Sequence, residues 1–107
     1  MHLSEILFRL GEDRENYFNA VSPPIMQSSN FAFQTLDEFR KAFSNEKEAN
    51  IYTRGNNPTV KILREKLAAL ENAEDCLVFG SGCAAISNTI LSQVEQGGHL
   101  VLSLIHI

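Results

Sequence analysis

The stretch VFGSGCAA, residues 78–85, decides the fold that this sequence predicts. The apolar run CLVF at 76–79 leads into it, and an apolar pattern with helical spacing follows it through residue 94. A Gly-Gly pair ends that pattern, and the apolar run HLVLS at 99–103 comes next. Strand, glycine turn, helix, turn and strand make a βαβ unit, which implies a largely parallel sheet. We therefore expect an α/β fold.

The turn Gly80-Ser81-Gly82 has the chemistry of an anion site. Glycine tolerates backbone angles and close approaches that a Cβ would forbid, and the first turn of the following helix aims free N–H groups at one point. With the positive end of the helix dipole, these groups favour a phosphate. The alternative is that the glycines only make a tight turn between strand and helix.

The same residues also satisfy the dinucleotide fingerprint, because Gly80, Gly82 and Ala85 have its spacing. That fingerprint requires an acidic residue about 20 positions later, which binds a ribose hydroxyl. The sequence has no acidic residue after Glu95. A dinucleotide-binding domain is therefore an outside alternative.

Two helices are expected ahead of the glycine turn. Residues 35–38 read as a capping box and open a helix that ends near Ser44. Asn57 is a suitable N-cap for the second helix, and Pro58 fits its first position. The apolar stripe of this second helix consists of Val60, Leu63, Leu67 and Leu70.

The charges of the second helix are expected on a solvated face, where single ion pairs contribute little. They are Lys61, Arg64, Glu65, Lys66 and Glu71. The remaining lysines, Lys41 and Lys47, are assigned to solvent as well.

The first 33 residues divide into a helix and an arm. Residues 1–11 have helical apolar spacing that Gly11 closes, whereas residues 12–33 have no period and contain Pro23 and Pro24. Long segments without regular structure are usually functional or lie on something else. We therefore expect an extended arm that lies against a partner subunit.

Tyr52 and Arg54 follow this arm, two residues apart. A guanidinium is a bidentate phosphate donor, and in an extended segment residues at this spacing share one face. Both side chains could reach a phosphate, including one that belongs to another subunit. The alternative is that Tyr52 is a packed aromatic residue and Arg54 a surface charge.

Composition narrows the class of protein. The 107 residues carry a formal net charge of −4, with no basic cluster, which argues against nucleic acid and anionic membranes as partners. No apolar run approaches the roughly 20 residues of a membrane span, and the start lacks a signal-peptide pattern, so we expect a cytoplasmic protein. Cys76 and Cys83 lack metal-ligand spacing, so we expect no metal.

Four segments, taken in order, resemble the Cys/Met-metabolism enzymes that depend on pyridoxal 5′-phosphate (PLP). They are PPIMQSSNFAF, YTRGNNPT, LREKLAALENAEDCLVFGSGCAAI and GGHLV, and the resemblance covers about residues 22–102. The family includes cystathionine γ-synthase, cystathionine lyases, methionine γ-lyase and O-acetylhomoserine sulfhydrylase. The resemblance implies the N-terminal part of a fold type I, aspartate-aminotransferase-like PLP-dependent transferase, truncated within the large-domain sheet.

The resemblance also implies five cofactor-binding residues. Tyr52 and Arg54 would cross a dimer interface to the PLP phosphate of the neighbouring subunit. Ser81, Gly82 and Cys83 would offer backbone N–H groups to the phosphate of their own subunit. Cys83 stands where the family usually has methionine, which a backbone contact tolerates. The parent enzyme would be a homodimer or homotetramer that acts on a small amino-acid substrate.

The implied parent reaction belongs to transsulfuration: β- or γ-elimination, or γ-replacement, on cystathionine, methionine or activated homoserine. The Schiff-base lysine of the family is absent from this chain, so no catalytic residue is expected in it. Residues 1–57 would form the helix and intersubunit arm, and residues 58–107 the incomplete start of the PLP-binding domain. The alternative is a catalytically dead product that at most binds at an interface.

Overall fold

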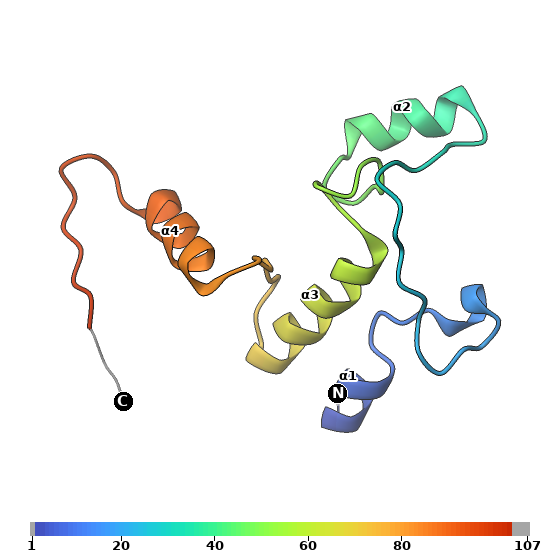
Figure 1. Cartoon of the computed structure of the whole chain (residues 1–107), viewed down its shortest axis with the longest axis horizontal. Coiled ribbons are helices and arrows are strands. Elements are labelled where there is room, and N and C mark those ends of the chain that lie inside the picture. Colours follow the sequence, from blue (N-terminus) through green and yellow to red (C-terminus); the bar gives the residue numbers. More distant parts are fainter. Residues whose placement is uncertain (1, 104–107) are drawn as a thin grey trace. The chain divides into compact units, whose positions relative to one another are not determined.

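A computed structural model describes residues 2–103 of the chain (Figure 1). Within these residues the regular elements are α1 (Leu3–Phe8), a 3₁₀ helix (Arg14–Tyr17), α2 (Leu36–Ser44), α3 (Pro58–Glu71) and α4 (Gly82–Gln93). The described residues form two units, which divide between Leu77 and Val78. The first unit therefore holds α1 to α3, and the second holds α4.

The starts of α2 and α3 confirm the predicted caps. At α2, the Oγ1 of Thr35 accepts the backbone N–H of Glu38 at 3.2 Å. At α3, the Oδ1 of Asn57 accepts the backbone N–H of Thr59 at 2.9 Å, with Pro58 in the first turn. Each cap satisfies a backbone donor that the helix itself leaves free.

The N-terminal segment follows the prediction only in part. The predicted helix over residues 1–11 forms as α1, which ends earlier, at Phe8, and Gly11 then adopts a left-handed conformation with φ of 72°. The arm over residues 12–33 is not extended throughout, because the 3₁₀ helix interrupts it. Asp13 and Phe18 flank this short helix with φ of 44° and 56°, so the chain turns at both of its ends.

The predicted strands do not form in the part of the chain that the structure describes. The runs at 76–79 and 99–103 are irregular, and α4 is the element of the βαβ unit that forms. The β pairing among residues 2–103 is one isolated antiparallel bridge, between Asn30 and Tyr52. A strand persists only when its backbone groups pair with a neighbour, and neither run has one here.

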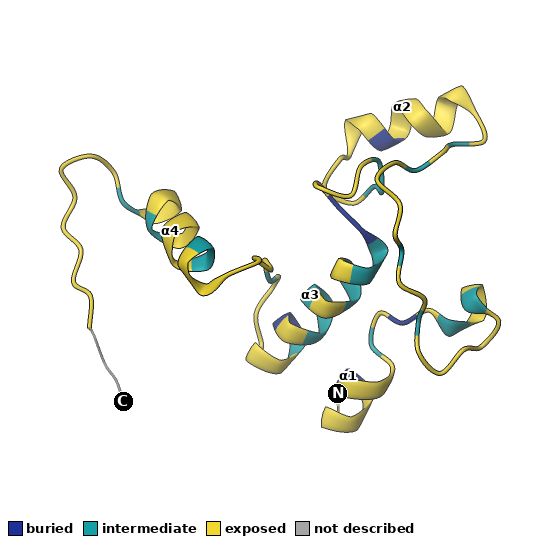
Figure 2. Cartoon of the chain, viewed as in Figure 1, coloured by how far each residue is buried: buried dark blue, intermediate teal, exposed yellow. Residues whose placement is uncertain are grey.

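Apolar burial is small within residues 2–103. Ile6, Ala42 and Ala68 are the buried apolar residues there. The stripe of α3 that sequence predicts as its packing face stays between 36% and 45% exposed, and Figure 2 shows α2 and α4 largely exposed as well.

Candidate functional site

Tyr52 lies where two segments distant in the sequence meet. It forms the antiparallel bridge with Asn30, which belongs to the arm. Beside the bridge, the backbone N–H groups of Phe31 and Thr53 donate to carbonyl oxygens of the opposite segment at 3.2 and 2.9 Å. Backbone pairing therefore fixes the main chain at the tyrosine.

A tight turn follows Tyr52 directly. The carbonyl oxygen of Tyr52 accepts hydrogen bonds from the backbone N–H groups of Gly55 and Asn56 at 2.9 and 3.1 Å. The segment is therefore not extended as far as Arg54, contrary to the sequence-based expectation. The two side chains still meet, because the turn places the guanidinium carbon of Arg54 5.0 Å from the centroid of the Tyr52 ring. This is the geometry of a cation–π contact.

Asn57 attaches the arm to the start of α3. The residue is 3% exposed, and its Nδ2 donates to the carbonyl oxygen of Met26 at 3.0 Å and to the Oγ1 of Thr53 at 2.9 Å. The Oγ1 of Thr59 accepts the N–H of Met26 at 2.9 Å. Sequence reasoning identified Asn57 as a helix cap but missed its second role, which joins the arm, the turn and the helix.

Tyr52 and Arg54 line an open pocket of about 300 Å³. The other lining residues are Glu46, Ala49, Ile51, Gly55 and Asn56. Although Glu46 borders this pocket, Arg54 forms no ion pair with any carboxylate in residues 2–103. An exposed guanidinium held over an aromatic ring and free of a carboxylate can accept an anionic group from solvent.

The start of α4 presents a second set of donors, in the other compact unit. The Oγ of Ser81 accepts the backbone N–H of Ala84 at 3.1 Å, which confirms the predicted helix start. The N–H groups of Gly82 and Cys83 precede it and have no acceptor among the described residues. Such free donors at the positive end of a helix suit an anion.

The glycines of this turn are not there for their backbone angles. Among described glycines only Gly11 and Gly97 have positive φ, so the expectation that Gly80 and Gly82 need unusual dihedrals is wrong. A Cβ added at either of them would meet nothing within 4 Å. The chain itself therefore leaves this space open, and what remains of the prediction is a close approach by another group.

Two charged residues of α3 were wrongly assigned to a solvated face. The ammonium of Lys66 contacts the buried carboxylate of Glu12 at 2.5 Å. The Nε of Arg64 donates to the carbonyl oxygen of Cys76 at 2.7 Å, and its guanidinium pairs with Asp75. The sequence held one signal for Lys66: it lies three residues after Leu63 and four before Leu70, within the apolar face.

These contacts lower two carboxyl pKa values. A hydrogen bond from Lys66 is the main cause that lowers the pKa of Glu12, and Arg14 adds to it against the opposing effect of burial. The backbone N–H of Cys76 is the main cause that lowers the pKa of Asp75, followed by the hydrogen bond from Arg64. Both carboxylates are thus held in their charged form.

No helix within residues 2–103 is both long enough and apolar enough to cross a membrane.

Comparison with known proteins gives a consistent family. A family model described as Cys/Met metabolism PLP-dependent enzyme matches residues 5–105. L-Methionine gamma-lyase of Treponema denticola is 42% identical over 87 residues, which are 81% of this chain and 22% of that protein. O-Acetyl-L-homoserine sulfhydrylase of Corynebacterium glutamicum is 34% identical over 93 residues, which are 87% of this chain and 21% of that protein.

A solved structure shares the fold of this region. Cystathionine gamma synthase from Xanthomonas oryzae pv. oryzae, crystallised with aminoacrylate and cysteine, superposes with a TM-score of 0.66 at 35% identity. The match covers 88% of this chain and 22% of that one. The chain therefore spans about a fifth of the length of the relatives it matches.

Proposed function

This chain belongs to the family of Cys/Met-metabolism PLP-dependent enzymes, and we propose that it supplies phosphate-binding groups to an enzyme of that family. Tyr52 and Arg54 would bind the PLP phosphate of a neighbouring subunit. The backbone N–H groups at Ser81, Gly82 and Cys83 would bind the phosphate of their own subunit. The family match argues against the dinucleotide-binding alternative.

The observation that carries this proposal is the Tyr52–Arg54 pair. Backbone pairing holds the tyrosine, the turn stacks the guanidinium 5.0 Å from its ring, and no carboxylate within residues 2–103 pairs with the arginine. This arrangement keeps a charged bidentate donor exposed and oriented, which a phosphate requires and a mere surface charge does not.

The residues present fit PLP at its phosphate. Free N–H groups at the start of α4 and open space at Gly82 suit the phosphate of the same subunit, and the guanidinium of Arg54 separately suits that of a neighbouring subunit. Bound PLP supplies an electron sink for breaking bonds in amino acids. This chain would hold and orient PLP. We assign no catalytic role to any lysine within residues 2–103.

We infer the substrate class from the relatives. Their names describe reactions of methionine and of O-acetylhomoserine, so the parent enzyme would act on sulfur amino acids or activated homoserine by elimination or replacement. It would work as a homodimer or homotetramer with the arm across a subunit boundary. The division of the sequence at residue 57 and the cytoplasmic location remain predictions.

Phosphate binding can be tested directly on the 107-residue chain. We would titrate the ¹⁵N-labelled protein with pyridoxine 5′-phosphate, which has no aldehyde to react with surface lysines, and with pyridoxine as the matched compound without phosphate. We expect the phosphate compound alone to shift the amide signals of Gly82 and Cys83 and the side-chain signal of Arg54. Equal shifts with pyridoxine would contradict the proposal.

Two variants separate a built site from general attraction to positive charge. Arg54→Met should remove the response near Tyr52 and leave the response at Gly82 intact. Arg40→Met is the matched control, because Arg40 is an exposed arginine on α2 whose nearest carboxylate contact is 4.0 Å long. If both variants weaken the response equally, the arginine at position 54 has no special role.

The activity itself can be tested in a chimera. Residues 22–102 of this chain would replace the matching segment of the Treponema denticola L-methionine gamma-lyase. We expect a folded chimera to retain methionine cleavage, and Arg54→Met within it to lose activity together with PLP. A folded chimera that binds PLP equally well with and without Arg54 would overturn the assignment of this residue.

A second candidate function is binding to a full-length relative without catalysis. The observation in its favour is that the helices expose large apolar side chains, among them Phe39 on α2 at 42% and Leu63 on α3 at 45%. Size-exclusion chromatography of the chain mixed with a full-length family member tests it. Co-elution that Tyr52→Ala weakens would support binding through this region, and separate elution would exclude it.

A further inference from the structure

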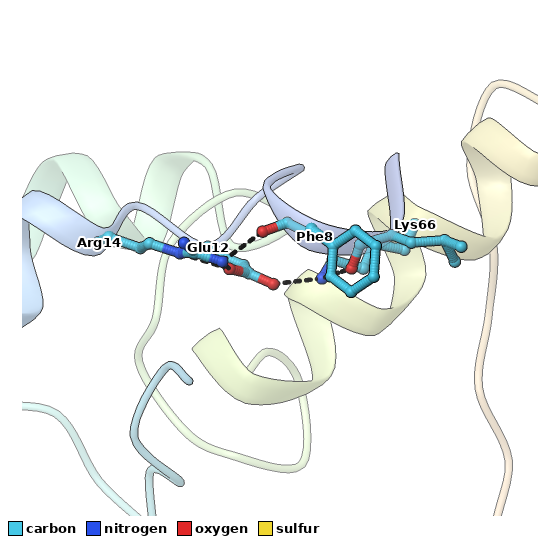
Figure 3. Close-up of polar contacts among 5 residues, drawn as sticks. Phe8, Glu12, Arg14 and Lys66 are labelled. Carbon is cyan, nitrogen blue, oxygen red and sulfur yellow. Dashed lines mark hydrogen bonds and ion pairs between the residues drawn. The ribbon is translucent and has the colours of Figure 1, made fainter. Parts of the chain in front are cut away.

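Glu12 is the centre of an ion cluster outside the proposed phosphate site (Figure 3). Glu12 is only 6% exposed. One carboxylate oxygen contacts the Nζ of Lys66 at 2.5 Å, and the other contacts the Nη2 and Nε of Arg14 at 2.6 and 2.8 Å. Charge-assisted hydrogen bonds of this kind are stronger than those between neutral groups. The cluster joins the start of the arm to α3.

The two cations of this cluster also complete the end of α1. The Nζ of Lys66 donates to the carbonyl oxygen of Leu7 at 2.8 Å, and the Nη2 of Arg14 donates to that of Phe8. These carbonyls belong to the last turn of α1, where the helix provides no donor. Positive charge is also favoured there, at the negative end of the helix dipole.

Apolar contacts alone hold α1 weakly. Within residues 2–103 this helix contacts α3 and no other helix. Ile6 is its buried residue, whereas Leu3 and Phe8 are 61% and 66% exposed. A six-residue helix is too short to persist by itself in water. Its position must therefore depend largely on the polar contacts around Glu12.

We propose that Glu12, Arg14 and Lys66 form an ionic clasp that fixes α1 on α3 and sets where the arm begins. Glu12 is the positioning residue, because it holds both cations at the end of α1. The arm is fixed a second time at Met26, which Asn57 and Thr59 bind. The clasp and this second attachment together determine the path of the chain toward the bridge at Tyr52.

The charge of the Glu12 carboxylate matters more to the clasp than the size of the side chain. Without this charge, Lys66 and Arg14 would remain as two neighbouring cations that repel each other, with no carboxylate to attract them. Glu12→Gln keeps the shape of the side chain, removes the charge and replaces one acceptor oxygen by an amide donor, so it is the sharpest perturbation. Glu15→Gln is the matched control, since Glu15 is an exposed acid in the adjacent 3₁₀ helix and forms no ion pair within residues 2–103.

Amide hydrogen exchange on the 107-residue chain tests the clasp. The N–H groups of Arg9 and Leu10 donate to the carbonyl oxygen of Glu5 at 3.0 and 3.1 Å, so they report on the end of α1. Since hydrogen bonds to charged groups are involved, Glu12→Gln should speed their exchange roughly tenfold or more. Glu15→Gln should leave the exchange of these two amides unchanged. Neither variant should change the exchange of the α4 amides.

Two outcomes would overturn the proposal. Unchanged exchange at Arg9 and Leu10 would mean that the clasp does not hold α1, and equal acceleration in α2 and α4 would mean a general loss of structure. Lys66→Met should produce the same local pattern as Glu12→Gln, and the double variant should be no worse than either. Additive effects in the double variant would show that the two side chains act independently.

Discussion

Loss of the Asn57 side chain should destabilise this structure strongly, because one side chain serves three segments. Its Oδ1 caps α3 through the N–H of Thr59, and its Nδ2 donates to the carbonyl oxygen of Met26 and to the Oγ1 of Thr53. Asn57→Ala removes all three hydrogen bonds. It also leaves the Met26 carbonyl without its side-chain donor in a partly buried setting.

The expected magnitude follows from these contacts. Losing an N-cap costs about 1 kcal/mol, and each of the two Nδ2 hydrogen bonds contributes about 1 kcal/mol net. The total of about 3 kcal/mol corresponds to an opening equilibrium that is roughly 150-fold larger. Thr35→Ala is the matched control, because Thr35 caps α2 through one hydrogen bond and holds no other segment. It should cost about 1 kcal/mol.

Amide exchange measured by NMR separates the two roles of Asn57. The N–H groups of Met26, Phe31 and Thr53 bond across the arm, so their exchange should rise by about two orders of magnitude in Asn57→Ala, as the summed hydrogen bonds require. In Thr35→Ala they should stay as they are. If Asn57→Ala affects only the first turn of α3, then the arm is held by other contacts and the reasoning fails.

Three further predictions concern charge and space. Acid should open the clasp, because the hydrogen bond from Lys66 lowers the pKa of Glu12 below its ordinary 4.5. The stabilisation is therefore full above pH 4.5 and is lost as the pH falls through the lowered pKa. The Cα chemical shifts of α1, measured against pH, will follow this loss. Arg64→Met should speed thiol labelling of Cys76, because the hydrogen bond that holds its carbonyl is lost. Gly82→Ala should change stability by no more than about 1 kcal/mol in urea unfolding, since the added Cβ meets nothing within 4 Å, yet weaken the response to pyridoxine 5′-phosphate.

Helix starts were predictable because a cap is a local feature. Thr35 and Asn57 each bind an N–H group within three residues of themselves, and the sequence alone shows that arrangement. Ser81 caps α4 in the same way, although no cap was predicted there. The strands at 76–79 and 99–103 were not predictable in the same way. Their apolar pattern is typical of strands that are buried between neighbouring strands and helices. The two runs do not pair with each other, so neither forms a strand.

The same difference between local and long-range contacts applies to the candidate site. The spacing of Tyr52 and Arg54 predicts a pair, and they do form one, but the turn between them depends on two backbone hydrogen bonds that no periodicity reports. Lys66 was misplaced for a similar reason. Its partner Glu12 lies 54 residues away in the sequence, and long-range ion pairs leave no regular trace in a helical pattern.

The exposed apolar side chains of the helices have a consequence for the fate of this chain in a cell. Chaperones bind exposed apolar surface of this kind, and proteases degrade chains that keep it uncovered. The abundance of the chain should then follow the supply of whatever covers its helices, as for an orphan subunit. Expression of a family member beside it should lengthen its half-life, and loss of that partner should lead to its clearance.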